Sequence, residues 1–337
     1  MKILVTGGAG YIGSHTCLEL SLAGHEVFVV DNLYNGHVEA IRRVEVLSGR
    51  SLGFFQLDIR NLEALSKVFG HYKPDAVVHF AGVKSVADSV TDPITYYDVN
   101  VCGSVSLLKA MDQVSCKNIV FSSSATVYGK PDYLPYDESH STNPVNPYGR
   151  TKLTVEETLN DWIVADNKRR ATALRYFNPL GAHFSGQIGE DTLATPNNIM
   201  PLIAEVAMGR QKCLNVFGDD YDTRDGTAIR DYIHVVDLAK AHVAAIEQQR
   251  SAKPFQVLNI GSGAGTTVLE LIEAFELASG VKVARKFAAR RNGDLPAFWA
   301  EPTLAYKQLG WKTSLSLQEM CRDTWNWKNN NPNGFNK

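Results

Sequence analysis

In KILVTGGAGYIG (residues 2–13), a short apolar run leads directly into three regularly spaced glycines, Gly7, Gly10 and Gly13. The apolar run predicts a buried parallel strand, and the segment after the glycines predicts a helix. Glycines at this spacing allow a tight turn, close approach of the backbone to a pyrophosphate, and close packing of the helix on the strand. The helix N-terminus then faces the anion. The stretch therefore predicts the start of a dinucleotide-binding fold, with an ordinary glycine turn as the alternative.

The end of the second predicted strand carries a carboxylate that favours the dinucleotide interpretation. Asp31 lies about 20 residues beyond the glycines, where an acidic residue binds the adenosine ribose hydroxyls. Because this carboxylate would repel a 2′-phosphate, we expect NAD rather than NADP as the cofactor. Asp58 and Ile59 end the third strand, and Asp58 is expected to face the adenine. An N-cap for the next helix, before Asn61, is an equally good interpretation of Asp58.

Short apolar runs alternate with helix-length stretches over the first half of the chain. The runs lie at 3–5, 27–30, 53–57, 76–80, 119–121 and 172–177, and the stretches at 12–23, 37–48, 61–70, 94–113 and 147–166. This alternation implies right-handed crossovers and predicts an α/β fold, a Rossmann-type doubly wound parallel sheet. Beyond residue 178 the alternation is less regular, with helices expected at 199–209, 235–249, 266–279, 302–309 and 316–328. We therefore expect a Rossmann domain at 1–177 and a smaller mixed α/β substrate lobe at 178–337, of which the part near 235–260 returns to the first domain.

The composition is that of an ordinary globular enzyme, and it argues against some partners. The 337 residues are 44% hydrophobic and 21% charged, and 34 basic against 36 acidic residues give a net charge of −2. No overall field attracts nucleic acid or an anionic membrane, so neither is expected as a partner. The five cysteines are scattered and no apolar run is long enough for a membrane span, so a cytoplasmic location is expected. None of the nine histidines has metal-ligand spacing, and no metal is expected.

Two segments carry candidate catalytic groups. In YGRTK (148–152), Tyr148 and Lys152 are four residues apart and share one face of a helix. The lysine cation is expected to lower the tyrosine pKa from about 10, which makes the phenol a proton acceptor near neutral pH. The serine run at 122–124 ends a strand, at the edge where ligands bind in open α/β sheets. The alternative is a polar strand end followed by a helix that begins with an aromatic residue.

Together with the glycines, these segments resemble the extended branch of the short-chain dehydrogenase/reductase family. The resemblance implies that Tyr148 is the catalytic acid or base and that Lys152 binds the nicotinamide ribose and tunes Tyr148. It also implies that Ser124 hydrogen-bonds the substrate oxygen. Dehydratases of this branch carry an Asp-Glu pair just after the hydroxyl residue, whereas Ala125 and Thr126 stand there in this chain. Dehydration is therefore not expected.

The same resemblance places further residues around NAD. Lys84, in the loop after the fourth strand, is expected to meet the pyrophosphate or to be a solvated loop charge. Asn100 is expected near the cofactor, with hydrogen bonding inside its own helix as the alternative. The other cofactor residues that we infer are Tyr11, Ile12, Asn32, Asn35, Gly36, Asp58, Ile59, Phe80, Ala81, Gly82, Ser122, Tyr148, Tyr176 and Phe177.

Five sequence blocks in the second half of the chain resemble blocks of the UDP-glucose 4-epimerase family, and they occur in the same number and order. They are RYFNPLG (175–181), PNNIMP (196–201), VFG (216–218), RDYIH (230–234) and RRNGDLP (290–296). The resemblance implies that Arg230 and Arg291 grip a diphosphate as planar, charge-assisted forks. It also implies that Phe217 packs on uracil and that Asp294 accepts from the uridine ribose. The other UDP-sugar contacts inferred are Asn178, Asn198, Ile199, Asn215 and Phe298, together with Lys84, Ser124 and Tyr148.

Phe298 bears on the width of the sugar site. Members of the family carry either a bulky ring or a small residue at this position, beside C2 of the hexose. A phenylalanine fills the space that an N-acetyl group needs, and close-packed walls do not yield easily. We therefore expect UDP-galactose and UDP-glucose as substrates and the N-acetylhexosamine forms as poor ones. The alternative is a core aromatic that follows a proline turn.

The activity implied is the NAD-dependent, reversible 4-epimerisation of UDP-galactose and UDP-glucose through a 4-keto intermediate, a step of galactose metabolism. Tyr148, aided by Ser124, would take the 4-hydroxyl proton while C4 gives hydride to NAD, and hydride would return to the opposite face of the sugar. Two alternatives remain: a 4-epimerase of a UDP-pentose or UDP-uronate, and a catalytically silent NAD-binding protein. The resemblance also implies a homodimer, with the helices near 94–113 and 147–166 paired across a two-fold axis.

Overall fold

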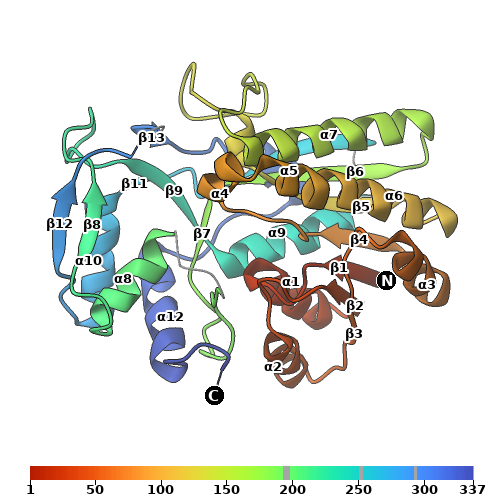
Figure 1. Ribbon diagram of the computed structural model, residues 1–337, viewed down its shortest axis with the longest axis horizontal. Helices are drawn as coiled ribbons and strands as arrows, with labels where there is room; N and C mark the ends of the chain where they lie inside the picture. The colour runs from red at the N-terminus through yellow and green to blue at the C-terminus, as the bar shows by residue number, and fades with distance from the viewer. Residues whose placement is uncertain (193–197, 250–252, 292–293, 337) are drawn as a thin grey trace.

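The computed structural model describes residues 1–192, 198–249, 253–291 and 294–336, which form two lobes (Figure 1). One lobe contains a large sheet with helices on both faces, and the other contains short strands and helices from the second half of the chain. Two of the predicted UDP-sugar blocks are only partly covered, because residues 196–197 and 292–293 lie outside the described residues.

The large sheet is entirely parallel. Its strands are, in spatial order, β10 (Phe255–Ile260), β6 (Arg170–Tyr176), β5 (Asn118–Ser124), β4 (Ala76–His79), β1 (Lys2–Thr6), β2 (Glu26–Asp31) and β3 (Gly53–Gln56). The order reverses between β1 and β4, which is where a doubly wound sheet opens its ligand crevice. The seventh strand, β10, comes from the second half of the chain and pairs with β6. The predicted Rossmann-type fold class is thus confirmed.

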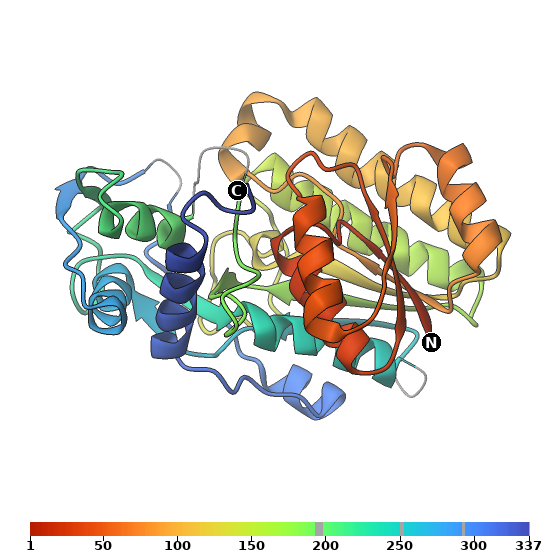
Figure 2. The same cartoon turned by 90° about the horizontal axis from the view of Figure 1, so that it is seen from below.

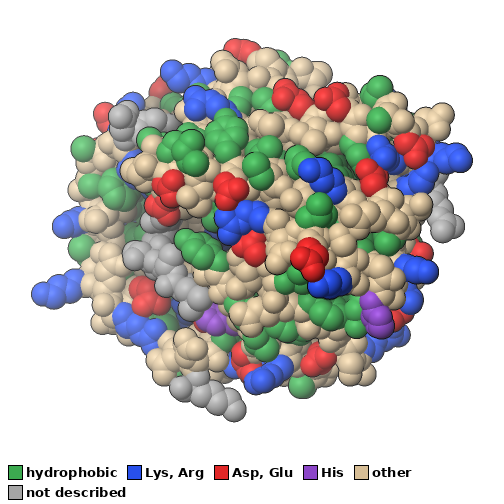
Figure 3. Space-filling model, turned by 45° about the vertical axis from the view of Figure 1, so that its right-hand side comes forward, with side chains coloured by type: hydrophobic (Ala, Val, Ile, Leu, Met, Phe, Trp, Pro, Cys, Tyr) green, Lys and Arg blue, Asp and Glu red, His purple; other side chains and the backbone are tan. Residues whose placement is uncertain are grey.

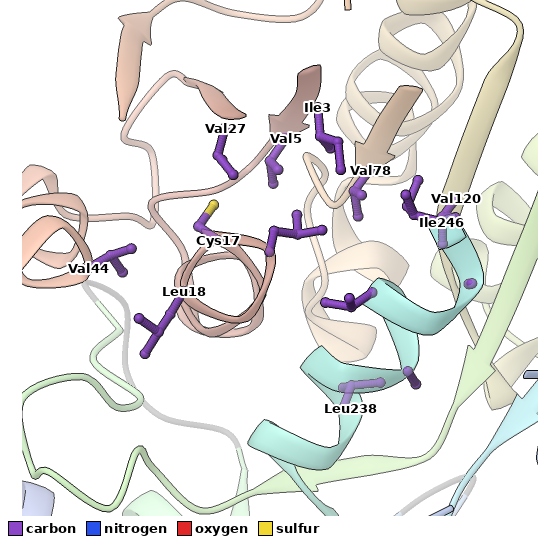
Figure 4. Close-up of a cluster of buried hydrophobic side chains, with 14 of the residues drawn as sticks. Ile3, Val5, Cys17, Leu18, Val27, Val44, Val78, Val120, Leu238 and Ile246 are labelled. Atoms are coloured by element: carbon purple, nitrogen blue, oxygen red, sulfur yellow. The ribbon is translucent and has the colours of Figure 1, made fainter. Parts of the chain in front are cut away.

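Two hydrophobic cores cover the two faces of the sheet (Figures 1 and 2). One face carries α1 (Tyr11–Leu22), α2 (Val38–Ser48) and α9 (Val235–Gln248), and the other carries α3 (Leu62–Tyr72), α6 (Gly103–Gln113) and α7 (Pro147–Ala165). Figure 4 shows part of the first core, where side chains of α1 and α9 pack with those of the central strands. Because both faces are covered, the strands read as continuous apolar runs in the sequence.

The second lobe is built around β9 (Ile229–His234). Its neighbours are β7 (Asn178–Leu180), β11 (Gly265–Thr267) and β13 (Ala297–Phe298), while β8 (Leu214–Phe217) pairs separately with β12 (Arg285–Ala288). Helices α8 (Ile199–Ala207), α10 (Val268–Ser279) and α12 (Leu317–Asn330) enclose a third core, and α11 (Thr303–Leu309) packs on α9 and β10. Thr267 and Ser316 open α10 and α12 with capping boxes, which satisfy the first backbone N–H groups of each helix.

The single helix expected at 94–113 is instead divided into three parts. It consists of α5 (Pro93–Tyr96), a π-helical segment η1 (Tyr97–Cys102) and α6. A further short helix, α4 (Val86–Thr91), precedes it, and a 3₁₀ turn η2 (Ala125–Val127) follows β5; neither was predicted. The π-helical segment contains Asn100, and such segments often mark functional sites.

One face of the molecule shows no concentration of one charge sign (Figure 3). Acidic and basic side chains are interspersed on the face drawn in Figure 3, as the small net charge suggests. All five cysteines are free thiols. None of the helices in the described ranges combines the length and the apolar character needed to cross a membrane.

Candidate active site

The glycine-rich turn has the geometry of a pyrophosphate cradle. Gly7 has a φ of +72°, and a Cβ there would lie 2.7 Å from the Ala81 backbone nitrogen, so only glycine fits. A Cβ on Gly13 would lie 2.1 Å from the Gly7 carbonyl oxygen. Gly10 is the N-cap of α1, and in the described structure no side chain caps that end of the helix. The first N–H groups of α1 are therefore available to an anion, and the turn fits a dinucleotide.

Asp31 stands at the end of β2, where it also braces this turn. Its Oδ2 accepts from the Ala9 backbone N–H at 3.0 Å and its Oδ1 from the Leu33 N–H at 2.8 Å. Burial raises the pKa of Asp31, and these two backbone donors oppose that rise. Gly36 packs against the same turn, since a Cβ there would lie 2.9 Å from the Ala9 carbonyl carbon.

Asp58 belongs to a charged cluster at the neighbouring strand end. It accepts from Asn32 Nδ2 at 3.0 Å and forms an ion pair with Arg60 at 2.8 Å, and Arg60 in turn pairs with Asp98. The hydrogen bond from Arg60 lowers the pKa of Asp58 to about 2. The N-cap of α3 is Asn61, whose side chain accepts from the Ala64 N–H, so the capping interpretation of Asp58 is wrong.

Asn100 holds the loop that follows β4. Its Oδ1 accepts from the Val83 N–H at 2.8 Å, and its Nδ2 donates to the Val83 carbonyl at 3.1 Å and to Thr151 Oγ1 at 3.0 Å. Gly82 fits tightly against it, because a Cβ there would lie 2.8 Å from Asn100 Oδ1. The asparagine thus connects η1, the loop and α7, and the alternative of bonding only within its helix is wrong. Lys84 follows Val83 in this loop and is half exposed. Its Nζ lies 3.4 Å from Glu190 Oε1, which also accepts from Asn198 Nδ2 at 3.1 Å.

The predicted catalytic residues come together where β5 meets α7. Asn146 caps α7, which places Tyr148 in the first turn. Tyr148 hydrogen-bonds with the Ser124 hydroxyl, which also accepts from Thr126 Oγ1 at 3.0 Å. Lys152 is buried one turn further on and donates to the Ser122 carbonyl at 2.8 Å. The arrangement can pass a proton between Tyr148 and an oxygen held beside Ser124.

The expectation that Lys152 lowers the pKa of Tyr148 is wrong for the protein chain alone. Burial raises the pKa of Tyr148 to about 12, although the hydrogen bond to Ser124 opposes this rise. The Lys152 ammonium is directed to the Ser122 carbonyl and lies 5.8 Å from the centroid of the Tyr148 ring. Its own pKa falls to about 8 through burial. Desolvation therefore dominates the pKa of each group.

The second lobe gathers the predicted diphosphate residues around one carboxylate. Asp294 accepts from Arg230 Nη2 at 3.2 Å and from Arg291 Nε at 3.0 Å. The Arg291 guanidinium lies 5.0 Å from the centroid of the Phe217 ring, and the Arg230 guanidinium lies 4.7 Å from that of Phe298. Two planar cations with aromatic faces beside them suit a nucleoside diphosphate.

Phe298 lies between this cluster and the catalytic strand. Its ring is 5.8 Å from that of Phe177, and both belong to an apolar wall with Ala125, Val127, Tyr128, Tyr136 and Ala300. The side chain of Phe298 is only partly buried, so it is not a fully enclosed core aromatic. Asn178, beside Phe177, has a buried Oδ1 that lacks a hydrogen-bond partner among the described residues, as expected of an atom that meets a ligand.

Several predicted residues lie apart from these groups or act through other contacts. Ile59 is buried in the core and packs tightly against Gly103. The ring of Phe80 packs on that of His242, with 4.6 Å between the ring centroids. Tyr11 donates to the Gly181 carbonyl at 2.6 Å and so joins α1 to the second lobe. Asn215 is exposed on β8. The rest stand where their elements place them: Ile12 in the first turn of α1, Asn35 in the segment between β2 and α2, Ile199 at the start of α8, and Tyr176 hydrogen-bonded to Ser122.

The sequence analysis missed residues that only the fold brings to the site. Glu156 and Arg175 form a buried ion pair that reaches the serine run through Ser123. Glu156 continues the four-residue spacing of Tyr148 and Lys152, and this signal could have identified it. Tyr221 has a buried hydroxyl without a partner among the described residues and lies close to the charges of Arg230 and Asp294, for which the sequence offers no signal.

Two buried histidines, His79 and His234, have structural partners. His79 lies between Thr6 Oγ1 at 2.7 Å and Ser104 Oγ at 2.8 Å, and burial lowers its pKa to about 3. His234 accepts from the Val236 N–H and lies 3.3 Å from Asp323. Across the described ranges, no three His, Cys, Asp or Glu side chains are grouped as metal ligands.

Comparisons with known proteins agree with this geometry. Residues 4–324 match the family model described as GDP-mannose 4,6 dehydratase. The UDP-glucose 4-epimerase of Bos taurus is 51% identical over 99% of this chain and 98% of its own. The crystal structure of the enzyme of that name from Stenotrophomonas maltophila, with bound NAD and formylated UDP-arabinopyranose, superposes with a TM-score of 0.96 at 48% identity over 98% of both chains. That from Bifidobacterium longum, in complex with NAD⁺ and UDP, gives 0.95 at 46% identity over 99% of this chain and 100% of the other.

Proposed function

The chain belongs to the UDP-glucose 4-epimerase family, and from this premise we propose that it catalyses the reversible, NAD-dependent 4-epimerisation of UDP-galactose and UDP-glucose. The observation that carries the proposal is the shared apolar wall. Phe177 and Phe298 connect the Ser124–Tyr148 pair to the arginines that suit a diphosphate. A sugar tethered through UDP would therefore meet the acid–base group.

NAD, when bound, supplies a reversible hydride acceptor for C4 and a positive ring charge that favours the Tyr148 phenolate. The glycine-rich turn and Asp31 would hold its pyrophosphate and adenosine ribose. Tyr148 takes the 4-hydroxyl proton and later returns it, while Ser124 orients the sugar oxygen. Arg230 and Arg291 retain the nucleotide while the 4-keto sugar turns. Strong contacts to UDP and weak contacts to the sugar suit a ring that must present both faces.

Dehydration, the activity for which the matching family model is named, lacks its acid–base pair in this chain. Ala125 and Thr126 follow Ser124, and the Thr126 hydroxyl donates to Ser124. Neither side chain can shuttle the protons that elimination of water requires. Epimerisation needs no acid–base group beyond the Tyr148–Ser124 pair.

Incubation of the purified protein with UDP-galactose, followed by an assay for UDP-glucose, tests the proposal. UDP-xylose and UDP-glucuronate serve as parallel substrates. Conversion of UDP-galactose supports the proposed activity, whereas turnover of only a parallel substrate would assign the chain to another UDP sugar. No turnover of any substrate, with NAD bound, would favour the catalytically silent protein.

We also infer the assignments that remain predictions: the NAD and UDP-sugar roles of the individual site residues, the division of the chain near residue 177, a homodimer, and a cytoplasmic location. Asn178, with its unpartnered Oδ1, supports the substrate assignment. The free thiols of all five cysteines suit a reducing compartment. Exposed apolar side chains on α4, α5 and η1 support the homodimer.

A further inference from the structure

A buried ion pair lies directly behind the catalytic strand. Glu156 on α7 and Arg175 on β6 have side chains that are only 4% and 7% exposed. Glu156 Oε1 accepts from Arg175 Nε at 3.0 Å, and Oε2 accepts from Nη2 at 2.6 Å, which makes the pair bidentate. Burying two charges is costly, and an apolar pair of similar volume often serves stability as well. The position of the pair therefore suggests a role beyond stability.

The pair contacts the catalytic strand through Ser123. Its hydroxyl donates to Glu156 Oε1. Ser123 stands between Ser122, whose carbonyl accepts from Lys152, and Ser124, whose hydroxyl bonds with Tyr148. Fixing Ser123 thus fixes the two strand positions that the catalytic helix uses.

The same carboxylate lies on the catalytic face of α7. Tyr148, Lys152 and Glu156 follow one another at intervals of four residues and are all buried. Arg175 is held on its far side, because its guanidinium lies 4.8 Å from the centroid of the Tyr128 ring and the Tyr128 hydroxyl donates to Asn259 at 2.6 Å. The position of the carboxylate is thus determined by β5, β6, α7 and, through Asn259, β10.

Resting on the proposed epimerase activity, we propose that Glu156, clamped by Arg175, is a positioning residue that fixes the serine strand against α7 and keeps the Lys152 ammonium charged. Among the described residues, the titratable groups besides Glu156 that face Lys152 or Tyr148 include Tyr148 itself on α7, His79 on β4, Tyr176 on β6 and Tyr96 on α5. Burial keeps His79 neutral at working pH. Glu156 therefore supplies the negative charge that opposes the desolvation of Lys152.

The direction of the effect follows from the charges. Burial lowers the pKa of Lys152 to about 8, and the charge of Glu156 raises it. Removal of that charge lowers the lysine pKa further, so the ammonium is lost at a lower pH. Activity that depends on a charged Lys152 should then fall at a lower pH than in the wild type.

Glu156→Gln in the NAD-loaded full chain tests this role, because glutamine keeps the size and an acceptor for Ser123 but removes the charge. We expect the alkaline limb of the kcat–pH profile for UDP-galactose to move down by about one pH unit. At neutral pH, kcat should fall about tenfold, while KM should stay within about twofold because the UDP contacts are intact.

Arg175→Lys is the matched comparison, because it breaks the bidentate geometry and keeps Glu156 charged. Its Tm should fall as that of Glu156→Gln does, but its alkaline limb should remain at the wild-type pH. Glu205→Gln is a distant control that loses the pair with Lys328 in the second lobe and should leave the profile unchanged.

If the alkaline limb of the kcat–pH profile is the same for Glu156→Gln and the wild type while Tm falls, Glu156 has only a structural role and the proposal is wrong. If Glu156→Gln does not fold, the double variant Glu156→Gln/Arg175→Met removes both buried charges, and its alkaline limb gives the same decision. A wild type that cannot convert UDP-galactose would instead count against the proposed function.

Discussion

At the scale of single residues, the reactivity of Tyr148 depends on a balance between burial and the charges brought to it. In the protein chain alone, burial dominates and the pKa of Tyr148 rises to about 12. The Ser124 hydroxyl and the positive nicotinamide ring oppose that rise, and an acid–base group should have a pKa near the working pH. We therefore expect the phenol to become a good base only when NAD is bound, which would link proton transfer to the presence of the cofactor.

Tyr148→Phe removes the phenolic oxygen and keeps the ring. We expect kcat for UDP-galactose to fall about 10²–10⁴-fold, the range for a positioned acid–base group. NAD and UDP affinities should change little, because the residues predicted to bind the two diphosphate groups lie elsewhere. Tyr133→Phe, which removes an exposed hydroxyl that donates to Asp137, is the control and should retain activity. Near wild-type turnover by Tyr148→Phe would remove the role given to this residue.

Asp31 should determine the choice between NAD and NADP. Asp31→Gly removes the charge that repels a 2′-phosphate, so the affinity for NADP relative to NAD should rise by at least about tenfold. NAD affinity itself should fall, because the variant also removes the carboxylate that accepts hydrogen bonds from the Ala9 and Leu33 N–H groups. Titration of the cofactor-free protein with each dinucleotide measures both, and Glu26→Gln at the exposed start of β2 is the control. Equal binding of NADP and NAD by the wild type would contradict the placement of Asp31.

At the scale of elements, β13 should determine how far the proposed sugar pocket can open. Phe298 lies opposite Arg230 of β9, and the backbone that follows it is fixed: the Ala300 N–H donates to Asp231 at 3.0 Å, and the Trp299 carbonyl accepts from the Tyr136 N–H at 2.9 Å. A strand held at this end cannot easily move away from a larger sugar. The width of the pocket should therefore depend on the side chain at 298 more than on movement of the backbone.

Phe298→Cys should open activity on UDP-N-acetylgalactosamine while the hexose reaction is largely kept. The smaller side chain leaves room beside the hexose C2, and it also removes the ring beneath the Arg230 guanidinium. We therefore expect a higher KM for UDP-galactose and a lower Tm from lost packing. Phe287→Cys, on the half-exposed ring of β12, is the control and should gain no new substrate. A wild type that uses both substrate classes equally, or a variant that gains nothing, would exclude the gatekeeper role.

The sequence predicted elements whose stability depends on their own residues. The apolar runs that became β1 to β6 appear close to their predicted positions, because burial on both faces leaves a continuous apolar pattern. The helices α1 to α3, α7 and α9 also lie close to their predicted ranges. The short strands β7, β9, β11 and β13 were not predicted. They are two to six residues long and exist because distant segments pair, which no local pattern reveals.

The same distinction holds for the site. The glycine-rich turn and the Tyr148–Lys152 spacing are local, so the sequence contained them. The sign of the Tyr148 pKa shift could not be predicted, because it depends on how deeply α7 packs against β5. Arg175 was assigned no role because its partner Glu156 is 19 residues away and meets it only across the α7–β6 contact.

At the scale of the whole molecule, the chain links its two lobes through shared elements. The chain leaves the second lobe through α9 and β10, which complete the helix layer and the sheet of the first. The Tyr11 hydroxyl, at the start of α1, also donates a hydrogen bond to the Gly181 carbonyl. The proposed NAD and UDP sites are thus connected by regular structure, as a reaction between two bound molecules requires.

The final prediction concerns the surface formed by α4, α5 and η1, which pack beside α7. Val90, Ile94 and Tyr97 are 63%, 76% and 37% exposed there, an apolar group that a second copy would cover in the proposed homodimer. Ile94→Asp places a charge in that contact, so light scattering should show a dimer for the wild type and a shift toward monomer for the variant. Leu277→Asp, equally exposed at 76% but on α10 in the second lobe, is the matched control and should remain dimeric. Since the proposed catalytic groups all lie within one chain, the Ile94 variant should keep its kcat if it stays folded. A monomeric wild type, or a dimer unaffected by Ile94→Asp, would rule out this surface as the interface and leave the proposed chemistry unaffected.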